Sequence, residues 1–393
     1  MSWRYLLLVV LAGVPARAEA VLVLPFFNLS QTPSLDWIGE SIAETVRESL
    51  AAGGVLTLGR DDRQEALRRL SLRPYALLTR ASVVKAGEAV DASHVVFGQY
   101  ELSGADPANE PAKATLRITS RIIDLKRIHQ GPELSELGAL EDLAALETHL
   151  SWQALRAIAP DTAPPEEEFR KTRPAVRLDA IENFVRGLLA AAPEQKHRFF
   201  SQAARLDPRF SQPCFELGRM YAEKKEYRYA ADWLERVTRA DSHYFEARFL
   251  LGLSRYHTGD YARAEAAFET VSSAAPLNEV FNNLAAAQSR QNGAGAVENF
   301  RKALEGDSAD PDYHFNLGYA LWKRARFEEA AESFRAALER KPDDPQATLL
   351  LGRCLKKTGP RPGDPRSDGL ERLKTNYEET AYRQLKAALE AKK

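Results

Sequence analysis

The side-chain types that most often carry out chemistry are present in this chain, but their spacing does not suit it. None of the seven histidines is four residues from another, the spacing that brings two imidazoles to one face of a helix. The chain has no phosphate-binding glycine loop, no nucleophile elbow and no C-x-x-C pair. The adjacent carboxylates Asp61-Asp62 and Glu378-Glu379 are typical of solvated helix starts. We therefore predict no catalytic, cofactor-binding or metal-binding residues and no enzymatic activity.

Composition and charge narrow the class of protein further. The 393 residues are 44% hydrophobic and 28% charged, as expected of a globular protein with roughly two or three domains. Its 54 Lys+Arg and 55 Asp+Glu give a formal charge of −1, which lacks the basic excess that nucleic-acid binding requires. The two cysteines, Cys214 and Cys354, are expected too far apart for a disulfide. Nucleic acid is therefore not an expected partner.

The first 18 residues have the three parts of a secretory signal peptide. Arg4 is followed by an apolar stretch from Leu6 to Val14 and by the small-x-small site Ala16-Arg17-Ala18. The apolar stretch is too short for a transmembrane helix. The chain has no cysteine before Cys214, so no cysteine follows the leader to carry a lipid. We expect a periplasmic or secreted mature protein without a membrane span. A leader retained as an anchor is the alternative.

A leucine followed by a small residue recurs at a fixed spacing in the second half of the chain. The small residues Gly218, Gly252, Ala285, Gly318 and Gly352 are 34, 33, 33 and 34 residues apart. An alanine follows eleven or twelve residues after each of the first four, and a leucine or phenylalanine four residues later. This L-G…A-x₃-F…P pattern is typical of the tetratricopeptide repeat, a pair of antiparallel helices that stacks into an α-solenoid.

The repeat pattern sets the expected boundaries of the second domain. Phe184 stands where the first unit should have its glycine, so this unit is expected to be degenerate. After Gly359 a proline-rich stretch breaks the array, and a charged amphipathic helix from Leu370 to Leu389 is expected to cap it. The repeats are expected over 177–359, as a degenerate unit at 177–210, units at 211–244, 245–277, 278–310 and 311–344, and a half-unit at 345–359, followed by linker and cap at 360–393.

The resemblance to tetratricopeptide proteins also implies a binding surface. In such arrays the first helix of each unit lines the concave face, and a groove of aromatic, cationic and amide side chains suits an extended or helical peptide. We expect Tyr319 and Trp322 to be exposed anchors, and Lys323 and Arg353 to meet a carboxylate. The alternative is that the groove phenylalanines pack on a neighbouring helix. The predicted groove residues are Phe215, Arg219, Phe249, Tyr256, Asn282, Arg290, Phe315, Tyr319, Trp322, Lys323, Arg353 and Lys356.

Before the repeats, β-rich runs alternate with helical patterns. The apolar run from Val21 to Phe26 suits a strand buried on both faces, and a short strand is expected at Val55–Leu58. Runs at 94–102 and 115–124 predict an antiparallel hairpin. Helices are expected from Leu35 to Leu50, over about 61–70 and 79–90, and over 140–158. These elements predict an α/β domain with a mixed sheet.

Four segments of this domain resemble a known family. VLVLPFFNLS, SLDWIGESIAETVRESL, VDASHVVFGQYELSG and LRITSRIIDLKRIHQG are similar to the amino-terminal α/β domain of TolB-type bacterial envelope proteins. The resemblance covers about 140 residues, which we assign to 19–160. It implies a fold and an envelope location rather than a chemistry.

A proline-rich, acidic stretch joins the two domains. Pro164, Pro165 and Pro174 flank three consecutive glutamates, which predicts a semi-extended linker at 161–176 and two independently folding domains. We therefore predict an exported, non-catalytic scaffold that binds a protein or peptide partner of the cell envelope in its groove. The alternative is a structural subunit of an envelope assembly that oligomerises or docks through the α/β domain.

Overall fold

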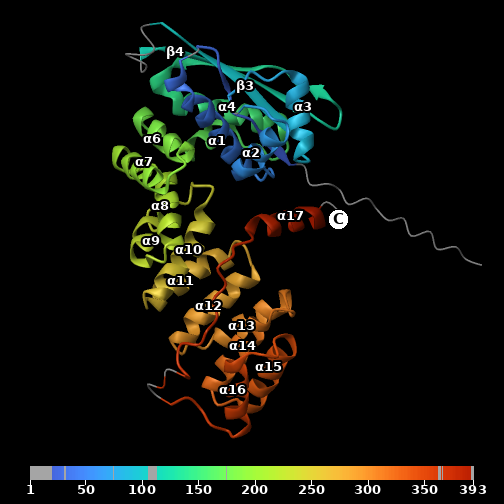
Figure 1. The fold of residues 1–393 in the computed structure, drawn as a ribbon, viewed down its shortest axis with the longest axis vertical. Helices are drawn as coiled ribbons and strands as arrows, with labels where there is room; N and C mark the ends of the chain where they lie inside the picture. Colours follow the sequence, from blue (N-terminus) through green and yellow to red (C-terminus); the bar gives the residue numbers. More distant parts are fainter. Residues whose placement is uncertain are drawn as a thin grey trace, which may run out of the picture.

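A computed structural model describes residues 20–390 except 31, 74, 105–112, 174, 362–363 and 365. The predicted signal peptide lies outside the described residues. A sheet domain occupies one end of the molecule, and paired helices extend away from it (Figure 1). The predicted fold class, a mixed α/β domain followed by an all-α solenoid, is confirmed.

The sheet is mixed, and its centre is the predicted hairpin. Strands β3 and β4 pair antiparallel over their whole length, with His94 opposite Asp124. Strands β1 and β2 pair parallel with β3, and β5 and β6 pair antiparallel with β4. The strands are β1 (Val21–Val23), β2 (Phe27–Asn28), β3 (His94–Ser103), β4 (Thr115–Asp124), β5 (His129–Gln130) and β6 (Leu134–Ala139).

Two details of the sheet differ from the sequence prediction. The strand expected at Val55–Leu58 is only a single bridge between Thr57 and Val21. Strand β6 was not predicted, because it lacks a buried apolar alternation: Leu134 is half-buried and Leu137 is exposed. An edge strand of this kind pairs through its backbone and leaves little pattern in the sequence.

Helices cover both faces of the sheet, which explains why β1 is apolar throughout. Val21 and Val23 pack towards α1 (Trp37–Ala52) and α4 (Leu143–Ile158). Leu22 and Leu24 belong to a separate cluster with α2 (Arg60–Arg69) and α3 (Arg80–Ala89). Because consecutive strand residues point to opposite faces, a strand between two helical layers needs no polar positions.

The predicted semi-extended linker is wrong. Its glutamates begin a short helix, α5 (Glu166–Lys171), since acidic side chains stabilise a helix N-terminus. Phe169 of this helix is buried, and the Arg173 guanidinium lies 3.7 Å from the centre of its ring. The indole of Trp152 in α4 donates a 3.0 Å hydrogen bond to the carbonyl of Pro164. The segment is therefore packed against the sheet domain.

The sheet domain and the first helices of the solenoid share one hydrophobic cluster. It runs from Val21 in the sheet through Phe169 and Phe184 to Ala267. Arg186 donates a hydrogen bond to the carbonyl of Ser34, which ties the solenoid to the start of α1. The expectation of independent folding, which rested on an extended linker, therefore loses its basis.

The second half of the chain consists of antiparallel helix pairs. Gly218, Gly252 and Gly318 let the helices approach: a Cβ atom at Gly218 would lie 2.5 Å from the Leu234 side chain. In the degenerate first pair Gly187 has this role opposite Phe200. The pairs are α6 (Leu178–Leu189) with α7 (Pro193–Leu206), α8 (Gln212–Glu223) with α9 (Tyr227–Leu234), α10 (Tyr244–His257) with α11 (Tyr261–Ser272), α12 (Asn278–Arg290) with α13 (Ala296–Gly306), and α14 (Pro311–Lys323) with α15 (Phe327–Arg340), before the unpaired α16 (Pro345–Leu355).

The C-terminal region differs most from its prediction. Helix α17 covers only Glu379–Glu390, and residues 366–378, which we call the tail, form neither helix nor strand. From the end near α16 the tail runs back along the solenoid to α17, which lies near α10 (Figure 1). The predicted capping helix from Leu370 is therefore wrong in its first nine residues, because these make their hydrogen bonds to the repeats instead of to one another.

Candidate functional site

The tail lies in the concave groove, which we define as the inward face of α10, α12, α14 and α16. Leu370 and Leu373 pack against the hydrophobic clusters of the repeats. The Tyr377 ring lies 5.1 Å from the ring of Phe249 in α10. The groove that the sequence predicted for a peptide therefore holds a segment of the same chain.

Two asparagines at equivalent repeat positions hold the tail backbone. The Asn316 side chain accepts a 2.8 Å hydrogen bond from the Arg372 amide and donates one of 2.7 Å to the Arg372 carbonyl. Asn283 makes the same pair of bonds with Lys374, at 2.8 and 2.7 Å. Asn282 adds a 2.8 Å bond to the Arg372 carbonyl. Alternate residues of the tail are thus held by successive repeats, as an extended chain allows.

Glu371 is the most enclosed charged group of the tail. Its side chain is fully buried, and Ser289 donates a 2.7 Å hydrogen bond to its Oε1. Lys323 Nζ lies 3.6 Å from Oε1, and Arg290 Nη1 lies 3.9 Å from Oε2. Tyr256 donates a longer bond of 3.4 Å to Oε2. A buried carboxylate needs such cationic and hydroxyl partners to offset its lost hydration.

The two basic side chains that follow meet an acidic group in the groove. Arg372 forms ion pairs of 3.0 Å with Asp312 and 2.6 Å with Asp344. Lys374 Nζ lies 2.6 Å from Asp310 and 2.9 Å from Asp312. Burial disfavours the charged form of Asp312, but bonds from Lys374 and Arg372 outweigh it and lower its pKa. The pKa of Asp344 is lowered in the same way by Arg372.

The predicted aromatic anchors are buried. Tyr319 and Trp322 have no exposed surface, so the expectation of exposure is wrong. Tyr319 donates a 2.9 Å hydrogen bond to the Ser367 carbonyl, and Trp322 donates one of 2.7 Å to the Thr358 carbonyl. Phe315 is also buried, with the Arg372 guanidinium 3.6 Å from its ring centre.

The other predicted groove residues lie in three places. Arg353 and Arg290 face the C-terminal region, with bonds of 3.0 Å to Asp364 and 3.1 Å to Asp368. At the other end of the solenoid Phe215 stacks on His243, with ring centroids 4.5 Å apart, and Arg219 pairs with Glu216. Lys356 is exposed at the end of α16.

Several residues that make these contacts were not predicted from the sequence. Asn283 and Asn316 stand directly before the leucine of the leucine–small-residue signature, in α12 and α14. A buried asparagine at a repeated position is a signal for backbone recognition, since its amide both donates and accepts. The acidic partners of the tail gave no such signal, because single aspartates at helix starts are common caps. The missed residues are Asn283, Asn316, Asp310, Asp312 and Asp344.

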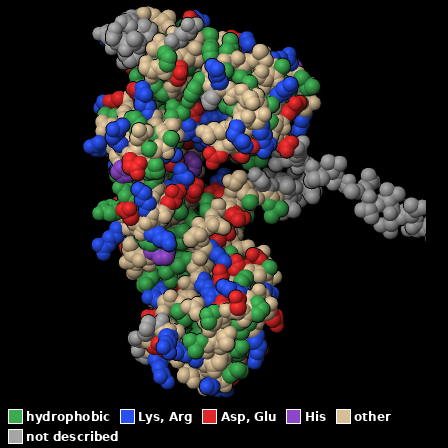
Figure 2. All heavy atoms as spheres, in the orientation of Figure 1, with side chains coloured by type: hydrophobic (Ala, Val, Ile, Leu, Met, Phe, Trp, Pro, Cys, Tyr) green, Lys and Arg blue, Asp and Glu red, His purple; other side chains and the backbone are tan. Residues whose placement is uncertain are grey.

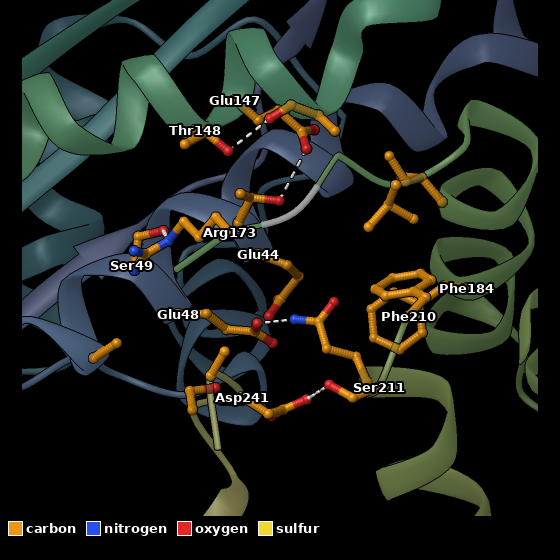
Figure 3. Close-up of a pocket in the computed structure, with 18 of the residues that line it drawn as sticks. Glu44, Glu48, Ser49, Glu147, Thr148, Arg173, Phe184, Phe210, Ser211 and Asp241 are labelled. Atoms are coloured by element: carbon orange, nitrogen blue, oxygen red, sulfur yellow. Dashed lines mark hydrogen bonds between the residues drawn. The ribbon is translucent and has the colours of Figure 1, made fainter. Parts of the chain in front are cut away.

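A partly open pocket lies where the sheet domain meets the solenoid. This cavity of about 160 Å³ is lined by α1, α4 and the first repeats. In Figure 3 Glu147 and Asp241 lie at opposite ends, with Phe184 and Phe210 along one side. Thr45 donates a 3.0 Å hydrogen bond to Glu147, whose other oxygen has no hydrogen-bond partner. Burial raises the pKa of Glu147 to about 7, and that of Glu48 to about 7.

The described residues include neither a metal-binding cluster nor a membrane-spanning helix. Within the described ranges, no group of three or more His, Cys, Asp or Glu side chains is placed to hold a metal ion. The helices of the described part of the chain include none that is long and apolar enough to cross a membrane. Both cysteines, Cys214 and Cys354, are buried free thiols.

Comparison with known proteins identifies the repeats. The tetratricopeptide repeat family matches residues 215–279, 285–345 and 318–359, so this part of the chain consists of tetratricopeptide repeats, a class of protein-interaction module. No curated protein sequence matches the chain.

Three similar solved structures each cover less than half of this chain. A MamA double mutant is 26% identical over 40% of this chain and 92% of its own, with a TM-score of 0.36. MamA from Desulfovibrio magneticus RS-1, residue 41 to the end, is 23% identical over 41% of this chain and 92% of its own, with a TM-score of 0.37. YrrB, a TPR protein with an unusual peptide-binding site, is 18% identical over 49% of this chain and 97% of its own, with a TM-score of 0.35.

Proposed function

We propose that the protein is a non-catalytic scaffold that binds an extended segment of a partner protein in the concave groove of its repeats. The observation that carries the proposal is the pair of backbone clamps from Asn283 and Asn316, which already hold an extended chain at Lys374 and Arg372. Such clamps contact only backbone atoms, so any extended segment can make them. Tetratricopeptide solenoids offer concave surfaces of this kind to their partners.

We also propose that the protein acts outside the cytoplasm, with a partner in the cell envelope. The support is the signal-like sequence of residues 1–18 and the resemblance of residues 19–160 to TolB-type envelope domains. Nucleic acid is not the proposed partner: on the face shown in Figure 2, acidic and basic side chains are intermingled without a large basic area. Mass spectrometry of the native protein should find an N-terminus near Glu19, and an intact Met1 would contradict cleavage of the leader.

The groove proposal is tested with a double variant of the full chain. Proteins retained from an envelope extract by the wild type are identified, purified and titrated against the wild type and Asn283→Ala/Asn316→Ala. We expect the double variant to bind at least about tenfold more weakly, since each lost amide removes two backbone bonds. The control is Asn376→Ala, an exposed tail asparagine. Equal binding by the double variant would place the partner on another surface and contradict the proposal.

A further inference from the structure

The tail meets the groove through side chains as well as through its backbone, and the side chains fix its register. Glu371 enters a site made by Ser289, Arg290 and Lys323. The next residue, Arg372, lies against Asp312 and Asp344. A cationic site and an anionic site are thus adjacent in the groove. A segment shifted by one residue would place its acid against the aspartates, which like-charge repulsion opposes.

We infer that the tail is an internal ligand that closes the groove, and that the partner displaces it with an extended segment of the same chemistry. That segment carries an apolar residue, a glutamate, a basic residue, a second apolar residue and a second basic residue, in the order of Leu370 to Lys374. The inference rests on the proposed function and adds to it the class of ligand and a competition for its site.

The helix pairs beneath the tail have a hydrophobic core of their own. The repeats next to the tail are held together by their own buried residues, among them Phe300 and Phe334. Leu370 and Leu373 are only partly buried on this core. In contrast, Asn282, Asn283 and Asn316 are completely buried, in part by hydrogen bonds to the tail. Water or another peptide backbone can replace these hydrogen bonds.

The covalent connection of the tail to the repeats favours the tail over a partner segment. A segment joined to its site by a short linker has an effective concentration on the order of millimolar, so the tail rebinds faster than a dilute partner arrives. The apparent dissociation constant of a partner segment is therefore the intrinsic constant divided by the fraction of chains whose groove is open. A variant that releases the tail should bind the same segment more tightly, although its groove is unchanged.

The test uses full-length chains and a fluorophore-labelled synthetic peptide with the sequence of residues 366–378. In Glu371→Lys the new ammonium group would face Arg290 and Lys323, so the tail should leave the groove. The matched control is Glu378→Lys, the same charge change at an exposed tail residue. By fluorescence anisotropy, we expect the peptide to bind Glu371→Lys at least about tenfold more tightly than it binds the wild type or the control.

The binding site and the displacement of the tail are checked with three further measurements. Adding Asn283→Ala/Asn316→Ala to Glu371→Lys should abolish the gain, and a peptide that itself carries Glu371→Lys should not bind. In the wild type, excess peptide should speed hydrogen exchange at the Arg372 and Lys374 amides of the chain, which donate to Asn316 and Asn283. This exchange measurement requires no substitution, so it remains decisive if a variant misfolds.

Three outcomes would overturn the inference, and they separate it from the proposed function. First, the peptide could bind the wild type and Glu371→Lys equally well and lose affinity when Asn283 and Asn316 are replaced. This result would show that the tail does not close the groove, but it would still support binding of a partner in the groove. Binding that the Asn substitutions leave unchanged places the peptide elsewhere and overturns the inferred ligand class. If no chain binds the peptide and the tail amides stay protected, the groove accepts no segment in trans, and both the inference and the proposed function fail.

Discussion

The indole nitrogen of Trp322 donates a 2.7 Å hydrogen bond to the carbonyl oxygen of Thr358, 36 residues later, where the chain leaves α16. Trp322 is fully buried, and the Arg353 guanidinium lies 5.8 Å from its ring centre. The side chain therefore joins α14 to α16 and fixes the point from which the C-terminal region turns back. Its role is structural, although its position in the repeat is one that tetratricopeptide proteins direct into the groove.

Trp322→Ala should lower the free energy of unfolding by about 3–5 kcal/mol, as expected for a large aromatic side chain removed from a packed core. Urea denaturation followed by circular dichroism measures the change. Lys356→Ala, at an exposed residue of the same region, is the control and should change stability by less than about 0.5 kcal/mol. If the two variants were equally stable, the burial of Trp322 would be wrong.

The signature glycines should respond differently to alanine, according to whether a second helix faces them. A Cβ atom at Gly218 would lie 2.5 Å from Leu234, so Gly218→Ala should destabilise the protein by about 1–3 kcal/mol. Gly352 lies in α16, and a Cβ atom there would have no neighbour within 4 Å. Gly352→Ala should stabilise the protein by roughly 0.5–1 kcal/mol, since alanine favours a helix. Thermal melts of both variants test this, and equal destabilisation would contradict it.

Stability should fall as the pH rises through neutrality, and Glu147 should be one cause. Its folded pKa of about 7 is above its ordinary value of 4.5, so the folded protein binds this proton more tightly than the unfolded chain does. The resulting stabilisation is complete below about pH 4.5 and is lost as the pH rises through 7. Glu147→Gln removes this dependence.

Glu147→Gln should therefore be more stable than the wild type at pH 8, by roughly 1–3 kcal/mol, with a much smaller gain at pH 5. Denaturation curves at both pH values measure the difference. Some pH dependence should remain in the variant, because burial also raises the pKa of Glu48 to about 7. Thr45→Val, which removes the hydroxyl bonded to Glu147, is a useful comparison and should be destabilising at pH 8. An equal gain at both pH values would show that Glu147 does not titrate in this range.

The sequence predicted the solenoid well, because each repeat carries its own packing signature. The small residue of the leucine–small-residue pair packs against the later phenylalanine of the same helix pair, as Gly252 does against Phe268 and Gly318 against Phe334. The sheet was predictable for a similar reason: the apolar run from Val21 and the hairpin of β3 and β4 are local patterns. Strand β6 lacks such a pattern and was missed.

The candidate site was predicted only as a set of positions. Its occupant was missed because the tail, read alone, has the polar and apolar spacing of an amphipathic helix, and Leu370, Leu373 and Tyr377 fit that spacing. Long-range bonds to Asn283 and Asn316 override the local preference. Similarly, the run from Glu166 to Glu168 predicts a linker, since no local pattern indicates that Phe169 is buried against the sheet domain.

Phe184 lies at the joint between the two domains. Phe184 in α6 belongs to the cluster that includes Val21 and Ile38 of the sheet domain, and its ring lies 5.1 Å from that of Phe210. Phe184→Ala should cost about 3–5 kcal/mol and should weaken both sides of the joint together. We expect faster hydrogen exchange in α1 and also in α8.

The matched control is Phe334→Ala, an equally drastic substitution of a fully buried residue in a separate cluster of the far repeats. It should speed exchange in α14 and α15 and leave the amides of α1 unchanged, because its cluster does not include the sheet domain. If Phe184→Ala affected only α6 to α8 while α1 kept its protection, the sheet domain would be a separate cooperative unit. The independent folding first expected from the proline-rich segment would then be correct despite the shared core.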